Sequence, residues 1–173
     1  MPATTANTAR YTSHYSGFTF LGHVPRTGRA WFMQACHEAG LKRLEQPPQR
    51  QLTVSIVRHP CDWLASHYAW AGYRPHVMPF DEFVARMLAK GGVYKNLFEP
   101  VGAEAWLRLE DFPYCAIELL ATVGGNTQHI ARLPRSNVAT VPPPKMHAQL
   151  RANVLECDAE MLQLFNYGTQ GTM

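Results

Sequence analysis

The chain predicts an α/β domain with a mainly parallel central sheet flanked by helices. Short apolar runs rich in β-branched and aromatic residues alternate along it with segments of helical periodicity. Two of these runs lead directly into arginine-bearing turns and then into helices. The composition, with 46% hydrophobic and 17% charged residues among 173, is typical of a globular chain with one sizeable core. We expect residues 1–17 to be a loosely ordered lead-in and residues 18–173 to form a single domain.

The first strand, turn and helix come at the start of this domain. Residues 18–24 form an apolar run of strand length and composition. Residues 25–28 (Pro-Arg-Thr-Gly) follow as a turn, and residues 30–39 have the apolar period of a helix. The first backbone N–H groups of a helix have no internal partner, and the helix dipole favours negative charge there. This turn therefore predicts an anion site.

The side chains of the turn suit phosphate or sulfate. Arg26 and Arg29 carry planar guanidinium groups that bind such oxygens in pairs. Thr27 adds a hydroxyl group, and Gly28 permits a positive φ and close approach of the backbone to a ligand. The alternative is an ordinary strand-to-helix turn with two surface arginines.

A second strand-to-helix junction follows a polar loop at residues 41–51. Residues 52–57 predict a buried strand and residues 61–71 a helix. Arg58 ends the strand, and Ser66 falls about one and a half turns into the helix, so that one phosphate fits between them. In the alternative, Arg58 caps a neighbouring helix and Ser66 packs against another one. Ligands of parallel α/β sheets bind beyond the carboxyl ends of the strands, so we expect both junctions to share one crevice.

The rest of the chain continues the alternation. Glu110 and Asp111 follow a predicted strand, and we expect them to anchor loops by pairing with arginines. Four prolines exclude regular structure over residues 134–147. We expect a helix over residues 80–88, a strand over 105–109, a helix over 112–123 and an amphipathic final helix over 150–165.

The two junctions resemble the sulfotransferases that use 3′-phosphoadenosine 5′-phosphosulfate (PAPS). Residues 25–31, Pro-Arg-Thr-Gly-Arg-Ala-Trp, are similar to the 5′-phosphosulfate loop of that family, P-K-[TS]-G-[TS]-[TS]-W. Residues 57–68 are similar to its 3′-phosphate motif, in which a serine follows an arginine by eight residues. Residues 107–112 resemble its downstream Y-E-D-L strand end, and weaker likenesses lie at residues 135–138 and 165–168. The resemblance covers most of the chain after the lead-in.

The resemblance implies a three-layer P-loop-like fold and a transfer reaction. A sulfuryl group would pass from PAPS to a hydroxyl or amine of a small-molecule or carbohydrate acceptor, leaving 3′-phosphoadenosine 5′-phosphate (PAP), without a metal. Trp31 would lie against the adenine or, as helix-face tryptophans more often do, in the core. The resemblance implies that the donor is bound by Arg26, Thr27, Gly28, Arg29, Ala30 and Trp31 on its 5′ side and by Arg58 and Ser66 at its 3′-phosphate.

Three features depart from the family pattern. The family lysine is Arg26 here, and an arginine supplies charge and hydrogen bonds but is a poor proton donor, because it stays protonated. Arg29 and Ala30 replace two hydroxyl residues that contact phosphate. The stretch before the strand at residues 52–57, where relatives often carry acceptor contacts and the base, is short.

The acceptor needs a general base. We rank Glu45 first because it lies in the loop after the first helix, with His37 and His76 next. The predicted catalytic residues are therefore Arg26, Glu45 and His37. His23 precedes the turn within the first strand, and we expect a structural role for it. For each histidine a surface or packing role is the alternative.

Other classes of protein fit less well. A module that binds the same nucleotide without transferring sulfate is favoured by Arg26 and the short acceptor region. A small P-loop kinase would need G-x-x-x-x-G-K-[ST], which the chain lacks. A net charge of +3 without a basic run speaks against nucleic acid.

Compartment and cofactors follow from simpler patterns. The four cysteines form no C-x-x-C pair, so we expect reduced thiols and neither zinc nor disulfides. No apolar run reaches the roughly 18 residues that span a bilayer, and residues 1–17 lack the apolar core of a signal peptide. We therefore expect a cytoplasmic protein without a membrane span. The sequence predicts no oligomeric state.

Overall fold

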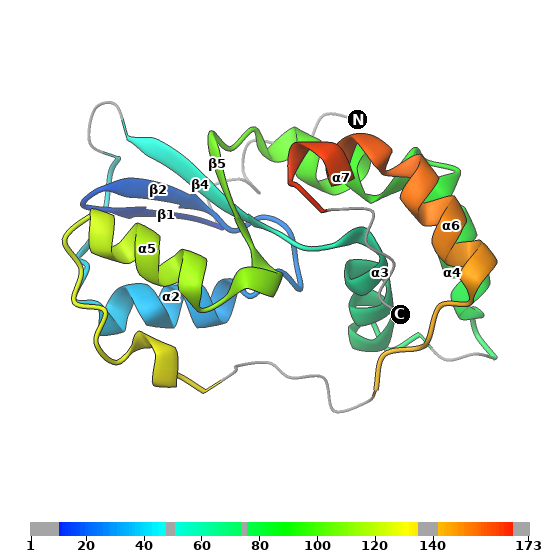
Figure 1. Cartoon of the computed structure of the whole chain (residues 1–173), viewed down its shortest axis with the longest axis horizontal. Helices are drawn as coiled ribbons and strands as arrows, with labels where there is room; N and C mark the ends of the chain where they lie inside the picture. Colours follow the sequence, from blue (N-terminus) through cyan, green and yellow to red (C-terminus); the bar gives the residue numbers. More distant parts are fainter. Residues whose placement is uncertain (1–10, 48–50, 74–75, 135–141, 168–173) are drawn as a thin grey trace. The chain divides into compact units, whose positions relative to one another are not determined.

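The computed structural model describes residues 11–47, 51–73, 76–134 and 142–167 (Figure 1). By its internal contacts the chain divides into two compact units. Unit 1 comprises residues 1–57 and 101–137, and unit 2 comprises residues 58–100 and 138–173. The described strands all lie in unit 1, whereas the described part of unit 2 is built of helices. The single domain expected over residues 18–173 stays a prediction.

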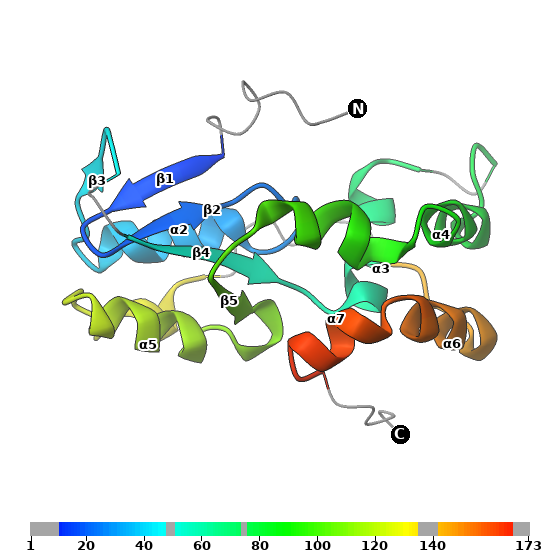
Figure 2. The same ribbon diagram turned by 90° about the horizontal axis from the view of Figure 1, so that it is seen from above.

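Unit 1 contains a sheet in which the described strands have the order β3-β1-β2-β4-β5 (Figures 1 and 2). β2, β4 and β5 run parallel, while β1 is antiparallel to both β2 and β3. The prediction of an α/β fold is confirmed, but the sheet is mixed, so the mainly parallel, P-loop-like arrangement is not. The strands are β1 (Thr12–Tyr15), β2 (Phe18–Leu21), β3 (Arg43–Leu44), β4 (Leu52–Val57) and β5 (Ala105–Arg108).

The mixed character of the sheet comes from β1. Only Ser16 and Gly17 connect it to β2, and a connection this short joins antiparallel neighbours, whereas parallel neighbours need a long crossover. The expected lead-in is therefore wrong for residues 12–15, while residues 1–10 lie outside the described part. Polar residues such as Ser13, which is 2% exposed, made this strand look like a surface segment in the sequence.

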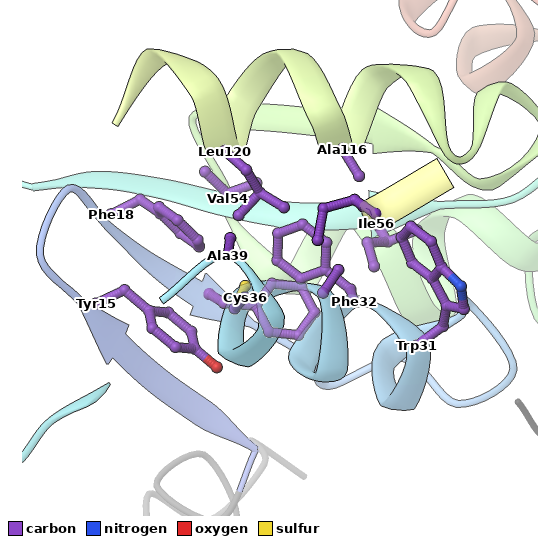
Figure 3. Packing of buried hydrophobic residues seen from close by; sticks show 13 residues of the cluster. Tyr15, Phe18, Trp31, Phe32, Cys36, Ala39, Val54, Ile56, Ala116 and Leu120 are labelled. Atoms are coloured by element: carbon purple, nitrogen blue, oxygen red, sulfur yellow. The ribbon is translucent and has the colours of Figure 1, made fainter. Parts of the chain in front are cut away.

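Two helices of unit 1, α2 (Arg29–Glu38) and α5 (Tyr114–Thr122), pack side by side on one face of the sheet (Figure 1). Their inner sides and the sheet enclose an aromatic core (Figure 3). Within it, the ring centres of Phe20 and Phe32 are 4.7 Å apart. Short 3-10 turns, η3 (Leu109–Asp111) and η4 (Ile130–Arg132), flank α5. The core cluster consists of Tyr15, Phe18, Phe20, Trp31, Phe32, Ala35, Cys36, Ala39, Val54, Ile56, Ala116, Leu120 and Ile130.

Unit 2 contains three helices in mutual contact, α3 (Pro60–Trp70), α4 (Phe80–Leu88) and α6 (Ala148–Cys157). Aromatic side chains fill much of the space between α3 and α4: Tyr68 packs against both Phe80 and Phe83. A π-helical turn, η1 (Tyr94–Phe98), leads into the 3-10 turn η2 (Glu99–Val101). The short helix α7 (Ala159–Leu164) follows α6.

The single final helix predicted over residues 150–165 is wrong, because Asp158 separates α6 from α7. The Asp158 carboxylate is 1% exposed and accepts hydrogen bonds from the backbone N–H groups of Val93 at 3.1 Å and Tyr94 at 2.8 Å. Burial raises the pKa of this carboxyl group, while those N–H groups and nearby His59 act in the opposite direction. The carboxylate thus joins the α6–α7 corner to the start of η1.

Several local predictions hold closely. β4 and α4 have the predicted bounds, 52–57 and 80–88. The loop expected over residues 41–51 contains the two-residue strand β3, and part of it lies outside the described residues. Residues 142–147 have no regular structure, as predicted, and residues 135–141 are not described. Within the described ranges, no helix is both long and apolar enough to cross a lipid bilayer.

Candidate functional site

The loop at residues 25–28, which lies between β2 and α2, has an unusual backbone. Arg26 has a φ of 63° and Gly28 a φ of 82°, so the positive φ expected at Gly28 is confirmed. A non-glycine residue rarely adopts a positive φ, and such residues concentrate at functional sites. A Cβ on Gly28 would also lie 2.6 Å from Cδ1 of Leu109. Glycine is therefore favoured at position 28 both by its φ and by the space beside it.

The loop leads into α2, whose N-terminus has no side-chain cap. Gly28 is the N-cap residue, and no side chain accepts a hydrogen bond there. The first turn of α2 also contains no acidic residue that would neutralise the positive end of the helix dipole. The positive potential at the start of α2 is therefore not offset by a side chain of the helix itself, which favours a negatively charged group there.

Thr27 closes the loop. Its side chain is 2% exposed, and its Oγ1 donates a hydrogen bond to the backbone oxygen of Val24 at 2.9 Å. Because phosphate and sulfate oxygens at neutral pH accept hydrogen bonds, a hydroxyl whose proton is already donated offers them little. The contribution of Thr27 to an anion site is thus to hold the loop rather than to donate its hydroxyl.

The Arg29 side chain lies against Gly22 and the Tyr11 ring. A Cβ built on Gly22 would lie 2.8 Å from Cδ of Arg29, so the stem of the arginine covers that glycine. The guanidinium carbon lies 4.9 Å from the centre of the Tyr11 ring, a cation–π distance. Its buried Nε has no hydrogen-bond partner among the described residues. The expected fork from Arg29 onto an anion therefore stays a prediction.

Ala30 and Trp31 occupy opposite environments. Ala30 is exposed, whereas Trp31 is 8% exposed and packs against Phe112, with ring centres 5.2 Å apart. Figure 3 shows Trp31 at the end of the core cluster of unit 1. The core alternative for Trp31 is thus the one that the structure favours, and little of the ring is left for an adenine.

His23 lies at the carboxyl end of β2, two residues before the loop. Its Nε2 is 3.2 Å from Oγ1 of Thr12, and its ring centre is 6.3 Å from that of Tyr11. Partial burial, with a smaller effect from the nearby Arg29 charge, lowers the pKa of His23 from its ordinary value of 6.5. At neutral pH this imidazole is uncharged. The structural role expected of His23 rested on its position within the predicted strand, just before the loop.

The two residues ranked first as bases lie away from the loop. His37 is exposed near the carboxyl end of α2, about 13 Å along the helix from Gly28 at 1.5 Å per residue. Glu45 is exposed and follows β3, two strand spacings or about 10 Å across the sheet from β2. The structure therefore does not bring Glu45 or His37 to the loop at Arg26. His76, also exposed, belongs to unit 2.

The second predicted anion segment belongs to unit 2. Arg58 is half-buried, and Ser66 is 5% exposed on α3. α3 begins at Pro60, so Ser66 lies about one and a half turns into the helix, as expected. The His59 ring between them in sequence meets the Tyr167 ring edge-on, with centres 5.3 Å apart. That this segment shares a crevice with the Arg26 loop stays a prediction.

The turn after β5 supports the Arg26 loop. Asp111 forms an ion pair with Arg108, with 3.0 Å between Oδ2 and Nε, so the pairing with an arginine expected of Asp111 is confirmed. Leu109, the first residue of η3, is the one that packs against Gly28. Glu110 is exposed.

The cysteines show no sign of reactivity or metal binding. All four are free, and Cys36 and Cys61 are buried. Burial raises the pKa of Cys36 to about 12 and of Cys61 to about 11, so both stay protonated at neutral pH. Within the described part of the chain, no three histidine, cysteine or acidic side chains gather as metal ligands.

Comparison with known protein families, with curated proteins and with solved structures finds no match for this chain. The function must therefore be argued from its own residues and geometry.

Proposed function

We propose that the chain is a PAPS-dependent sulfotransferase that transfers a sulfuryl group to a hydroxyl or amine of a small-molecule or carbohydrate acceptor. The observation that carries the proposal is the loop at residues 25–28, where Arg26 and Gly28 both have a positive φ and deliver an uncapped helix start. Its sequence resembles the 5′-phosphosulfate loop of that family. Backbone N–H groups at a helix start bind phosphate and sulfate by general electrostatics.

The proposed reaction is an in-line displacement at sulfur. The acceptor oxygen or nitrogen forms a bond to sulfur while the bond from sulfur to the phosphate oxygen breaks, and that oxygen keeps the electron pair as PAP leaves. Negative charge grows on the leaving oxygen, so fixed positive groups lower the barrier. Arg26 and the N–H groups of the loop supply that charge. Arg26 stabilises the leaving group without protonating it, because a guanidinium keeps its proton.

The 3′-phosphate of the donor is assigned to the segment after β4. Arg58 supplies a guanidinium for two parallel hydrogen bonds, and Ser66 supplies a hydroxyl from α3. A 3′-phosphate distinguishes PAPS from the common adenine nucleotides, so this segment would set donor specificity.

A second candidate is a module that binds PAPS or PAP without transferring sulfate. Two observations favour it: the family lysine is Arg26, and the hydroxyl of Thr27 is used inside the loop. The two candidates share the donor site and differ only in turnover.

The experiment that tests the proposal follows sulfate from ³⁵S-labelled PAPS into a panel of phenols, alcohols, amines and sugars. We expect labelled product, no transfer of ³²P from γ-labelled ATP, and a loss of about 10²–10³-fold in Arg26→Ala. Arg26→Lys, which restores a group able to give up a proton, should retain or raise the rate. PAP binding without any transfer would select the inactive module, and transfer from ATP would select a kinase.

A further inference from the structure

Four side chains of unit 1 gather at the carboxyl end of β2. His23 is hydrogen-bonded through Nε2 to Oγ1 of Thr12 at 3.2 Å. The centre of the Tyr11 ring lies 6.3 Å from that of His23 and 4.9 Å from the guanidinium carbon of Arg29. The titratable and charged groups around His23 are thus Tyr11, from the residues before β1, and Arg29, from the first turn of α2.

In this cluster one ring nitrogen of His23, Nδ1, is available to accept a proton. Nδ1 has no hydrogen-bond partner among the described residues, while Nε2 is committed to Thr12. If Nε2 donates to the threonine oxygen, Nδ1 carries the lone pair. Partial burial first, and the Arg29 charge second, lower the pKa of His23, which keeps the ring neutral at pH 7. A neutral imidazole with an available lone pair is able to accept a proton.

His23 is also close to the proposed reaction centre. It lies two residues before Pro25, so its Cα is within about 7 Å of the first residue of the loop. The bases ranked higher from sequence are farther away: Glu45 lies about 10 Å across the sheet from β2, and His37 lies about 13 Å along α2 from Gly28.

We propose that His23 is the general base that activates the acceptor, with Thr12 as the positioning residue that fixes its ring. The inference rests on the proposed function. As the acceptor O–H attacks sulfur, its proton passes to Nδ1 of His23 and its electron pair forms the new O–S bond. The S–O bond to the phosphate breaks, PAP leaves with that pair, and the imidazolium later returns its proton to water. Arg29 limits the lifetime of the imidazolium by repulsion.

The test compares His23→Asn, which keeps a hydrogen-bonding side chain but cannot act as a base, with wild type and with His129→Asn. His129 is an exposed histidine of the same unit and serves as the matched control. PAP affinity is measured by calorimetry, and PAP release from PAPS is measured with water, 4-methylphenol or 4-nitrophenol as acceptor. The two phenols differ in whether they need a general base. 4-Methylphenol, like tyrosine, has a pKa of about 10, whereas 4-nitrophenol loses its proton near neutral pH without a base from the protein.

We expect His23→Asn to bind PAP like wild type and to lose about 10²–10⁴-fold in kcat with water or 4-methylphenol. With 4-nitrophenol the loss should be small, because its phenolate needs no base. In wild type, kcat/KM for 4-methylphenol should rise with pH as His23 loses its proton. The same rise should be absent from His23→Asn. Thr12→Val should show an intermediate loss in kcat with an unchanged KM for PAPS, and His129→Asn should show none.

A second readout does not depend on turnover. In NMR titrations of the histidine ring protons, bound PAP should raise the pKa of His23 by placing negative charge beside it and leave that of His129 unchanged. Equal losses with both phenols, a loss of PAP affinity in His23→Asn, or an unmoved His23 pKa would overturn the base assignment. Failure of wild type to bind PAP would instead overturn the proposed function, and PAP binding without turnover on any acceptor would overturn the base while keeping the donor site.

Discussion

The two proposed phosphate-binding segments are built by different means. In unit 1, the loop at residues 25–28 depends on backbone conformation: two positive φ angles, an internal Thr27 hydrogen bond and a glycine beside Leu109. In unit 2, Arg58 and Ser66 are side chains at and within an ordinary helix that begins with a proline. The first segment depends on its backbone conformation, whereas the second depends on the chemistry of two side chains.

This difference predicts which mutations mainly lower stability and which mainly weaken binding. Substitutions in the unit 1 loop should change folding and function together. Substitutions at Arg58 or Ser66 should change donor affinity more than they change stability. The strongest test of the contrast is therefore at the glycine of the loop.

Gly28→Ala is expected to have the largest effect. An alanine at a φ of 82° costs about 1–2 kcal/mol, and the displacement of Leu109 by its Cβ adds about 1–3 kcal/mol. The melting temperature should fall by roughly 2–4 °C per kcal/mol, and PAP binding should be lost. Gly40→Ala is the matched control, because Gly40 has a φ of 75° but open space around it. Equal destabilisation by the two substitutions would show that crowding at Leu109 does not matter.

Asp158→Ala tests how much the buried Asp158 carboxylate stabilises unit 2. Removing the buried carboxylate leaves the N–H groups of Val93 and Tyr94 without their acceptor, at about 2–3 kcal/mol. Asp158→Asn, which keeps one amide oxygen, should lose about half as much. Chemical denaturation measures both. A stability equal to that of wild type in Asp158→Ala would contradict the bracing role given to this carboxylate.

Arg58→Ala should weaken PAP binding by about 10–100-fold, the value of a charge-assisted hydrogen bond to phosphate. Ser66→Ala should weaken it by about 2–10-fold, as expected for a neutral hydrogen bond. Both should melt within a few degrees of wild type. Calorimetric titration with PAP measures the affinities, with Ser16→Ala, at an exposed serine of unit 1, as the control. If both variants bind PAP normally, the 3′-phosphate assignment is wrong.

Arg26→Gly should separate stability from function. A residue with a side chain pays about 1–2 kcal/mol to adopt the φ of 63°, and glycine does not. Glycine instead lowers the stability by about 0.5–1 kcal/mol, because it gives the unfolded chain more conformational freedom. The net result should be between no change and a gain of about 1.5 kcal/mol in unfolding free energy, together with weaker donor binding. A variant that is less stable than wild type would mean that the Arg26 side chain contributes more to the fold than its backbone strain costs.

The contribution of His23 to the pH dependence of folding stability should be the smallest of these effects. Because the folded pKa of His23 lies below 6.5, the unfolded chain takes up a proton first as the pH falls. The contribution of His23 to stability is thus complete above pH 6.5 and is lost as the pH falls below it. His23→Asn should therefore lose less stability than wild type on acidification through that range. Identical acid dependence of the two proteins would mean that His23 has an ordinary pKa in the fold.

The sequence predicted those features that depend on local pattern. β4 and α4 are apolar runs with clear ends, and the φ at Gly28 follows from a glycine between a strand and a helix. β1 was missed because its pairing partner, not its own polar residues, makes it a strand. The break at Asp158 depends on N–H groups more than sixty residues away in sequence. Contacts of this kind leave no local signal.

The same distinction applies to the candidate site. The loop at Arg26 was identified from its own residues, and so was the segment at Arg58. The base was ranked by position in the chain, which put Glu45 and His37 ahead of His23. Only the pairing of β1 with β2 brings Thr12 and Tyr11 to His23 and shows its surroundings.

The central claim, a donor site specific for a 3′-phosphorylated nucleotide, is tested most directly by thermal unfolding with PAP, ADP or AMP. A ligand present at 100 times its dissociation constant stabilises the folded chain by about 2.7 kcal/mol, which corresponds to a rise of several degrees. We expect that rise with PAP and little or none with ADP or AMP. Equal rises with PAP and ADP, or no rise with PAP, would contradict it.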